Sequence, residues 1–183
     1  MRFQFYVTMN DADYLDFNCF WMIRSDYGRA QISKMRGTMV LIAALIWGVT
    51  WIFSGFALSS LWGLIPIGAM LAFLQLTLKR FLTFSIKGQI QSLKKSGKLA
   101  YSPEGTIEFY DDCFVEITPE NKTEIRYTAI ESVSVLPQKA IYIHLDTVRA
   151  HILMYQAFES GAQYDEFVEF LKTKTANVRV YEA

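Results

Sequence analysis

The stretch Gly37–Leu78 contains forty-two consecutive residues without a charged side chain. A bilayer core requires roughly 20 apolar residues per helix, so this stretch is long enough for two spans and little else. The two apolar runs are Met39–Leu58 and Leu61–Leu78, separated by a pair of serines. A connection this short requires antiparallel helices. The sequence therefore predicts a transmembrane helical hairpin over residues 38–79.

A soluble helical hairpin and a signal peptide both explain this stretch less well. Helices that are apolar on every face need a large protein around them when they are soluble, and a chain of 183 residues cannot supply one. A signal peptide has an apolar region of about 7–15 residues close to the N-terminus. Here the apolar stretch begins near residue 38 and is much longer.

The charges are divided unevenly along the chain. Residues 1–96 have ten Lys or Arg and four Asp, a net charge of +6, whereas residues 97–183 have eight Lys or Arg and fourteen Asp or Glu, a net charge of −6. Cations flank both spans, and the connection between the spans has none. By the positive-inside rule, both flanks and both termini lie in the cytosol. The sequence predicts a multi-pass cell-membrane protein with two spans, and the lipid bilayer is its first predicted partner.

Five cations follow the second span on a helix expected to end near Gly97. Such basic segments attract anionic lipid headgroups, although an ordinary positive-inside flank has the same composition. The possible lipid-contacting residues are Lys79, Arg80, Lys87, Lys94 and Lys95.

The hairpin itself has the character of an anchor. Proton relays and ion-coupled transporters usually place an ionisable residue within the membrane, and neither predicted span contains one. Gly68 and Ala72 form a small-xxx-small pair, a pattern that lets helices approach closely. Packing within the hairpin and formation of a homo-oligomer explain this pair equally well.

The N-terminal segment predicts a strand followed by a helix. Phe3, Phe5 and Val7 alternate with more polar residues, which is typical of a strand. A lone strand is not stable in water, so we expect it to join a sheet in the later part of the chain. Asn10 is a favourable N-cap, and the helix it begins runs to about Ser25. This helix either lies on the membrane surface or packs on the cytosolic domain.

From residue 98 the sequence consists of short strands and tight turns, followed by one helix. About six strands are expected to form an antiparallel meander. Ser160 and Gln163 form a capping box, and the helix after it has an apolar stripe. A bent sheet closed by a C-terminal helix is the pattern of pleckstrin-homology-like domains. The predicted strands cover residues 106–109, 114–117, 123–127, 132–136, 140–145 and 148–154, and the helical stripe contains Tyr164, Phe167, Val168 and Leu171.

The fold class predicted from these patterns is that of an α+β membrane protein. It combines a two-helix transmembrane hairpin with a cytosolic antiparallel β meander closed by a C-terminal helix. The expected parts are an N-terminal strand and juxtamembrane helix (1–37), the hairpin (38–79), a basic juxtamembrane helix (80–97) and a β-rich domain (98–183).

Several segments along the chain carry a resemblance to a known family. They are Asp13–Asn18, the two spans, Phe109–Glu116, Ile125–Ile130, Ala157–Phe158 and Tyr164–Phe167. On these segments the chain resembles the YcxB-like family of bacterial membrane proteins over essentially its whole length. The resemblance implies a membrane hairpin inserted ahead of a cytosolic, pleckstrin-homology-like domain. It implies no catalytic residues and no assigned activity.

No residue pattern predicts catalysis, a cofactor or a metal. His144 and His151 are the only histidines, and each is expected to be a partly buried sheet residue. Cys19 and Cys113 are far apart in sequence and do not form a CxxC motif. The acidity of residues 97–183 disfavours nucleic acid as a partner.

Three functions remain open at this point. The favoured one is a membrane-anchored interaction or regulatory module with an unknown protein partner. The alternatives are a module that contacts lipid headgroups at the inner leaflet and an uncharacterised enzyme.

Overall fold

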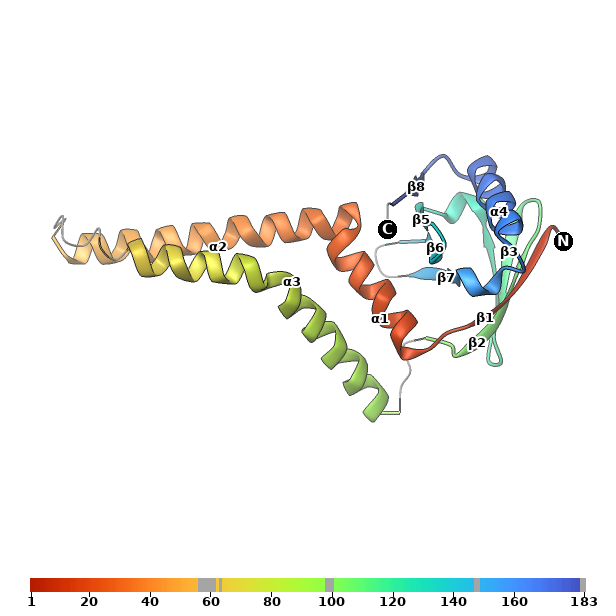
Figure 1. Cartoon of the computed structure of the whole chain (residues 1–183), viewed down its shortest axis with the longest axis horizontal. Helices are drawn as coiled ribbons and strands as arrows, with labels where there is room; N and C mark the ends of the chain where they lie inside the picture. The colour runs from red at the N-terminus through yellow and green to blue at the C-terminus, as the bar shows by residue number, and fades with distance from the viewer. Residues whose placement is uncertain (56–61, 63, 98–100, 147–148, 182–183) are drawn as a thin grey trace. The chain divides into compact units, whose positions relative to one another are not determined.

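The computed structural model describes residues 1–55, 62, 64–97, 101–146 and 149–181 (Figure 1). The chain divides into two compact units. The helical unit is Asn18–Lys98, and the sandwich unit combines Met1–Phe17 with Leu99–Ala183. The predicted serine turn between the spans lies outside the described residues.

The helical unit contains two helices that are long and apolar enough to cross a membrane. They are α2 (Asp26–Phe53) and α3 (Leu64–Lys95). Only 6% of the most apolar window of each helix is buried, so most of its apolar side chains face outward. The core helix of a soluble protein would be mostly covered. Both helices extend beyond the predicted spans, α2 before Met39 and α3 after Leu78.

A tight corner separates the N-terminal helix from α2. Helix α1 (Asp11–Cys19) continues into the π-helical turn η1 (Phe20–Arg24), and the predicted end near Ser25 is confirmed. Ser25 caps α2 by accepting a hydrogen bond from the backbone N–H of Gly28 at 3.0 Å. A Cβ at Gly28 would collide with the backbone of η1. This corner therefore requires glycine at position 28.

Two sequence expectations about the glycines in and after α3 have different outcomes. The helix runs on to Lys95, and Gly97 has a φ of +73°, which confirms its predicted place just beyond the helix end. By contrast, a Cβ added at Gly68 would meet no atom of the described residues within 4 Å. Within the described part of the hairpin, helix packing therefore does not explain the small-xxx-small pair.

Two four-stranded sheets form the sandwich unit, where the sequence suggested one meander. Sheet A has the order β1-β2-β3-β4 and is antiparallel throughout; sheet B has the order β7-β6-β5-β8, with β8 parallel to β5. The strands of sheet A are β1 (Phe3–Thr8), β2 (Glu104–Phe109), β3 (Cys113–Ile117) and β4 (Lys122–Arg126). Those of sheet B are β5 (Ser132–Leu136), β6 (Ala140–His144), β7 (Ala150–Met154) and β8 (Val178–Val180).

The predicted pairing of the N-terminal strand with the later sheet is confirmed. Strand β1 pairs with β2 in a register that runs from Phe3 opposite Phe109 to Thr8 opposite Glu104. The alternation of β1 places Phe5 and Val7 in the core, while its other face is exposed. The helical unit is thus inserted in the sequence between two neighbouring strands of one sheet.

The two sheets share one hydrophobic core, which helix α4 (Gly161–Lys174) closes at one end (Figure 1). All four residues of its predicted apolar stripe are buried. Ser160 accepts a hydrogen bond from the Gln163 N–H at 3.2 Å, as the capping box predicts. The reciprocal bond of the capping box is displaced by one residue. The Gln163 side chain accepts from the N–H of Glu159 at 2.8 Å and not from the N–H of the N-cap Ser160.

Helix α1 packs on the outer face of sheet B, which decides between the two positions left open by the sequence for residues 11–17. The ring of Phe17 lies 5.1 Å from that of Tyr142 and 6.1 Å from that of His144. Asp16 forms an ion pair with Lys139 at 2.8 Å. Strand β6 is consequently buried on both faces.

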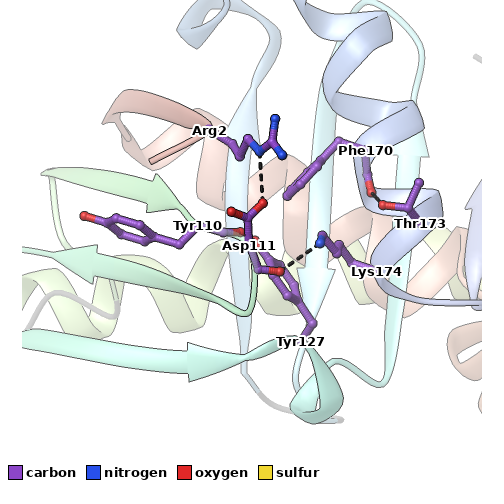
Figure 2. Close-up of polar contacts among 7 residues, drawn as sticks. All are labelled: Arg2, Tyr110, Asp111, Tyr127, Phe170, Thr173 and Lys174. Atoms are coloured by element: carbon purple, nitrogen blue, oxygen red, sulfur yellow. Dashed lines mark hydrogen bonds and ion pairs between the residues drawn. The ribbon is translucent and has the colours of Figure 1, made fainter.

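A group of polar and aromatic contacts fastens α4 to the turn between β2 and β3 (Figure 2). Lys174 Nζ donates to the carbonyl oxygen of Asp111 at 2.8 Å, and it lies 5.2 Å from the ring centre of Phe170. Arg2 binds the Asp111 carboxylate at 2.9 Å. The Tyr127 hydroxyl donates to the carbonyl of residue 110 at 2.8 Å. We call the end of the sandwich covered by α4 the closed end.

Truncation of Phe167 should unfold the sandwich unit selectively. This ring is fully buried and lies within 5.3 Å of the rings of Phe3, Phe5 and Phe109. Phe167→Ala should cost about 3–5 kcal/mol, a large share of the roughly 5–15 kcal/mol that stabilises a domain. Limited proteolysis of the purified protein should then cleave residues 99–183 rapidly. Glu166→Ala, on the exposed face of the same helix, should behave like the parent; equal resistance of both variants would contradict this packing.

Candidate ligand-binding cavity

The end of the sandwich away from α4 contains a cavity of about 450 Å³. On β1, Phe3 and Phe5 contact α4, whereas Val7 lines the cavity. Strand β2 likewise has Phe109 at the closed end and Ile107 at the cavity. Small-ligand sites usually have volumes of about 300–1,000 Å³. We call this the open end.

Apolar side chains from both sheets form much of the cavity wall. They belong to Val7, Ile107, Ile125, Leu145 and Ile152, and Phe17 of α1 joins them. A mostly apolar wall with a few converging polar groups is the usual composition of a small-molecule site.

Glu116 and His151 form a polar pair in this wall. His151 Nδ1 lies 3.1 Å from Glu116 Oε1, and the side chains are 9% and 34% exposed. Interaction with the His151 ring lowers the pKa of Glu116, against the effect of burial. Glu116 is therefore ionised at neutral pH.

The remaining charged groups leave the cavity wall acidic. Arg149 also lines it, but its Nε donates to the carboxylate of Asp146 at 2.7 Å. The Glu104 carboxylate accepts a hydrogen bond from the Tyr6 hydroxyl at 2.7 Å on the outer face of sheet A, so its charge lies outside the cavity. The inward carboxylate of Glu116 thus shares the cavity with an arginine whose charge is largely offset.

The cavity also includes the two chain segments that lead into and out of the helical unit. The Tyr101 hydroxyl donates to Asp11 at 2.6 Å, and the rings of Tyr14 and Tyr101 lie 5.1 Å apart. Burial, followed by the hydrogen bond to Asp11, raises the pKa of Tyr101 to about 12, so this phenol stays a neutral donor. We call these interactions the root contact; both tyrosines line the cavity.

The five cations predicted to contact lipid belong to α3 in the helical unit, and all are exposed. Arg80, Lys87 and Lys94 are seven residues apart, so they drift by only about 20° per step around the helix and share one face. Lys79 and Lys95 lie about a quarter turn to either side. The described residues that line the cavity all belong to the sandwich unit.

Both histidines occupy sheet positions, as the sequence predicts. His144 is 1% exposed, and its Nε2 lies 3.3 Å from Ser134 Oγ. Burial lowers the pKa of His144 to about 4. Among the described residues, no group of three or more His, Cys, Asp or Glu side chains is arranged to hold a metal ion.

Sequence analysis did not identify the cavity, although one signal pointed to it. Along β3, strict alternation places Glu116 on the same face as Phe114, which is fully buried. A charged residue at an inward position of a strand is unusual and marks a possible site. Its partner His151 lies on a strand of the other sheet, and sequence spacing does not show which residues meet across a sandwich.

Comparison of this chain with protein-family models, with curated proteins and with solved structures gives no match.

Replacing His144 should reduce how steeply the free energy of unfolding of the sandwich unit depends on pH in acid. The unfolded histidine titrates near 6.5 and the folded one near 4, so the unfolded state binds more protons between these values. Stability should fall as pH decreases from 6.5 to 4, by roughly 3 kcal/mol in total. His144→Gln should remove most of this slope in denaturant titrations at several pH values. His151→Gln should retain it; an unchanged slope in His144→Gln would assign the acid sensitivity to other groups.

Proposed function

We propose that this chain is a two-span membrane protein of the YcxB-like type, whose pleckstrin-homology-like domain acts in the cytosol as an interaction or regulatory module. Its membrane insertion is supported by two long, outward-facing apolar helices with cationic flanks. The domain type is supported by seven strands in two facing sheets and a C-terminal helix that closes one end. Strand β8 is an addition to that pattern.

The single observation behind a regulatory role is the position of the cavity at the roots of the hairpin. Met9 and Tyr14 precede the helical unit in sequence, Tyr101 and Ser102 follow it, and all four line the cavity. A bound group would touch both segments through which the hairpin joins its domain. A ligand shifts a conformational equilibrium only as far as it binds the two states differently. A ligand bound in this cavity would touch residues whose arrangement depends on the root contact. It could therefore bind two arrangements of the root contact with different affinity.

The contents of the cavity are proposed to be a small ligand or a side chain of a protein partner. Its volume of about 450 Å³ suits either one and is too small for a whole secondary-structure element. The proposal assigns no chemical reaction to the site. The domain would detect a molecule at the inner membrane surface and change how it presents its hairpin or a partner-binding surface.

A second proposed function is contact with anionic lipid headgroups through α3. The specific observation is the common face of Arg80, Lys87 and Lys94, with the exposed ring of Phe84 between Arg80 and Lys87 on that face. Each basic residue near an anionic surface contributes about 1 kcal/mol. This function is compatible with the first, because it uses the helical unit.

The proposed orientation can be tested by cysteine labelling in intact cells. In a background with Cys19→Ala and Cys113→Ala, a cysteine introduced as Ser59→Cys should react with an impermeant maleimide from outside. Ser102→Cys should react only after permeabilisation, because the positive-inside rule places the sandwich domain in the cytosol. Labelling of Ser102→Cys in sealed cells would reverse the orientation.

A photocrosslinking amino acid at the cavity should identify what binds there. Thr123 lines the cavity and is exposed, so a benzophenone side chain in its place should give a defined adduct in native membranes, detected by mass spectrometry. Thr173, exposed on α4 at the closed end, is the matched control and should give no such adduct. Equal adducts from both positions, or none from Thr123, would contradict the cavity as the binding site.

A third position in the same experiment tests the lipid-contacting function. Gln91 lies between Lys87 and Lys94 on the basic face of α3 and is exposed. Crosslinks from Gln91 to anionic phospholipid would support that function. Crosslinks only to zwitterionic lipid would show that the basic face does not select headgroups.

A further inference from the structure

The charged groups around the open-end cavity indicate which class of ligand it suits. We propose that the cavity binds an organic cation, an ammonium or guanidinium group on a small apolar body. This rests on the proposed function in using the same cavity, and it names the class of group that the cavity would accept. The group can belong to a free amine or to a lysine or arginine side chain.

The first step of the argument is the placement of Glu116. Its side chain is only 34% exposed and projects from the inner face of β3 into a space walled by Val7, Ile107 and Ile125. A carboxylate that is partly removed from water is stabilised by a cation that reaches it, and an anionic ligand would be repelled. His151 contacts one oxygen of this carboxylate through Nδ1.

The second step is the balance of the remaining charges. The carboxylate of Glu104 binds the Tyr6 hydroxyl on the outer face of sheet A, so it adds no charge inside the cavity. Arg149 is the one Lys or Arg among the described lining residues, and Asp146 binds both its Nε and its backbone N–H at 2.7 Å. An anionic ligand would have to compete with Asp146 for this arginine while lying near the Glu116 carboxylate.

The third step is the aromatic component of the wall. Tyr14, Tyr101 and Phe17 all line the cavity, with the two tyrosine rings 5.1 Å apart. Aromatic faces attract cations within about 6 Å of the ring centre, and they pack equally well on an apolar body. The Glu116 carboxylate and the aromatic rings together favour an amphiphilic cation over a purely polar one such as a metal ion.

Methyl NMR of the full-length protein in nanodiscs tests this directly. Benzylamine, benzyl alcohol and benzoate present the same ring with a positive, a neutral and a negative group. Benzylamine should shift the methyl signals of Ile107, Ile125 and Ile152 in a saturable way and leave Ile141 of the shared core unchanged. Nα-acetyl-lysine methylamide, tested in the same way, mimics a lysine side chain within a protein. It should bind if the natural group is a lysine side chain, and it should not bind if the cavity accepts only small-molecule amines.

Charge variants assign the effect to the Glu116 carboxylate. Glu116→Gln should weaken benzylamine binding by roughly tenfold to a hundredfold, the loss expected for one charged hydrogen-bonding partner. Glu166→Gln, on the exposed face of α4, should have no effect. The isoleucine spectrum reports whether each variant is folded. Glu104→Gln, on the outer face of sheet A, is a second control that should leave binding unchanged.

The outcomes separate this inference from the proposed function. Benzoate or benzyl alcohol binding as well as benzylamine would overturn the cation preference while the cavity remained a binding site. Absence of benzylamine-induced shifts at the three isoleucines would overturn the cation site altogether. If Thr123 gives an adduct in membranes but benzylamine does not bind, the proposed interaction module stands and the proposed cationic ligand is excluded.

Discussion

The sandwich unit depends on the ladder between β1 and β2, which joins two chain segments separated by the entire helical unit. Its six residue pairs run from Phe3–Phe109 to Thr8–Glu104. Closing a long loop costs little more than closing a short one, since each doubling of length adds only about 0.6 kcal/mol. A large helical insertion between two paired strands is therefore thermodynamically acceptable. In return, the ladder places Phe5 in the core and brings both ends of the insertion to the same end of the sandwich.

That placement explains why the two ends of the sandwich differ. At the closed end, α4 fills the space between the sheets with Phe167 and Leu171, both fully buried. At the open end, the chain leaves β1 at Thr8 and returns to β2 at Glu104. The connecting segments there are polar, and the space between the sheets is left as a cavity of about 450 Å³. Insertion of the hairpin and formation of the cavity are thus two consequences of one topology.

The features that the sequence predicted are those set by local physics. The capping box at Ser160, the helix end at Gly97 and the alternation of Phe3, Phe5 and Val7 each depend on residues within one turn or strand. Pairing of β1 with the later sheet followed from the instability of a lone strand. The apolar stripe of α4 was equally predictable, because helical periodicity alone defines it.

The features that the sequence did not predict depend on contacts between distant segments. Nothing local to the turn around Tyr127 shows that the meander divides there into two sheets. Strand β8 pairs parallel to β5, whose neighbour in sequence is β6. The contact of Glu116 with His151 crosses from one sheet to the other. Alternation along β3 is enough to place Glu116 inward, but no local pattern identifies the group opposite it.

The root contact limits how strongly cavity and hairpin can influence each other. Binding and conformational change are reciprocally linked, so a ligand that favours one arrangement of the roots must itself bind that arrangement more tightly. Among the described residues, the contact includes a hydrogen bond from Tyr101 to Asp11 and the ring pair of Tyr14 with Tyr101, and the Met9 N–H donates to the Pro103 carbonyl beside it at 2.8 Å. A hydrogen bond contributes about 0.5–1.5 kcal/mol and an aromatic pair a similar amount. Their sum corresponds to a shift of roughly one to two powers of ten in an equilibrium constant. A cavity coupled only through these contacts would therefore adjust the populations of two arrangements, and an all-or-none switch would need further contacts.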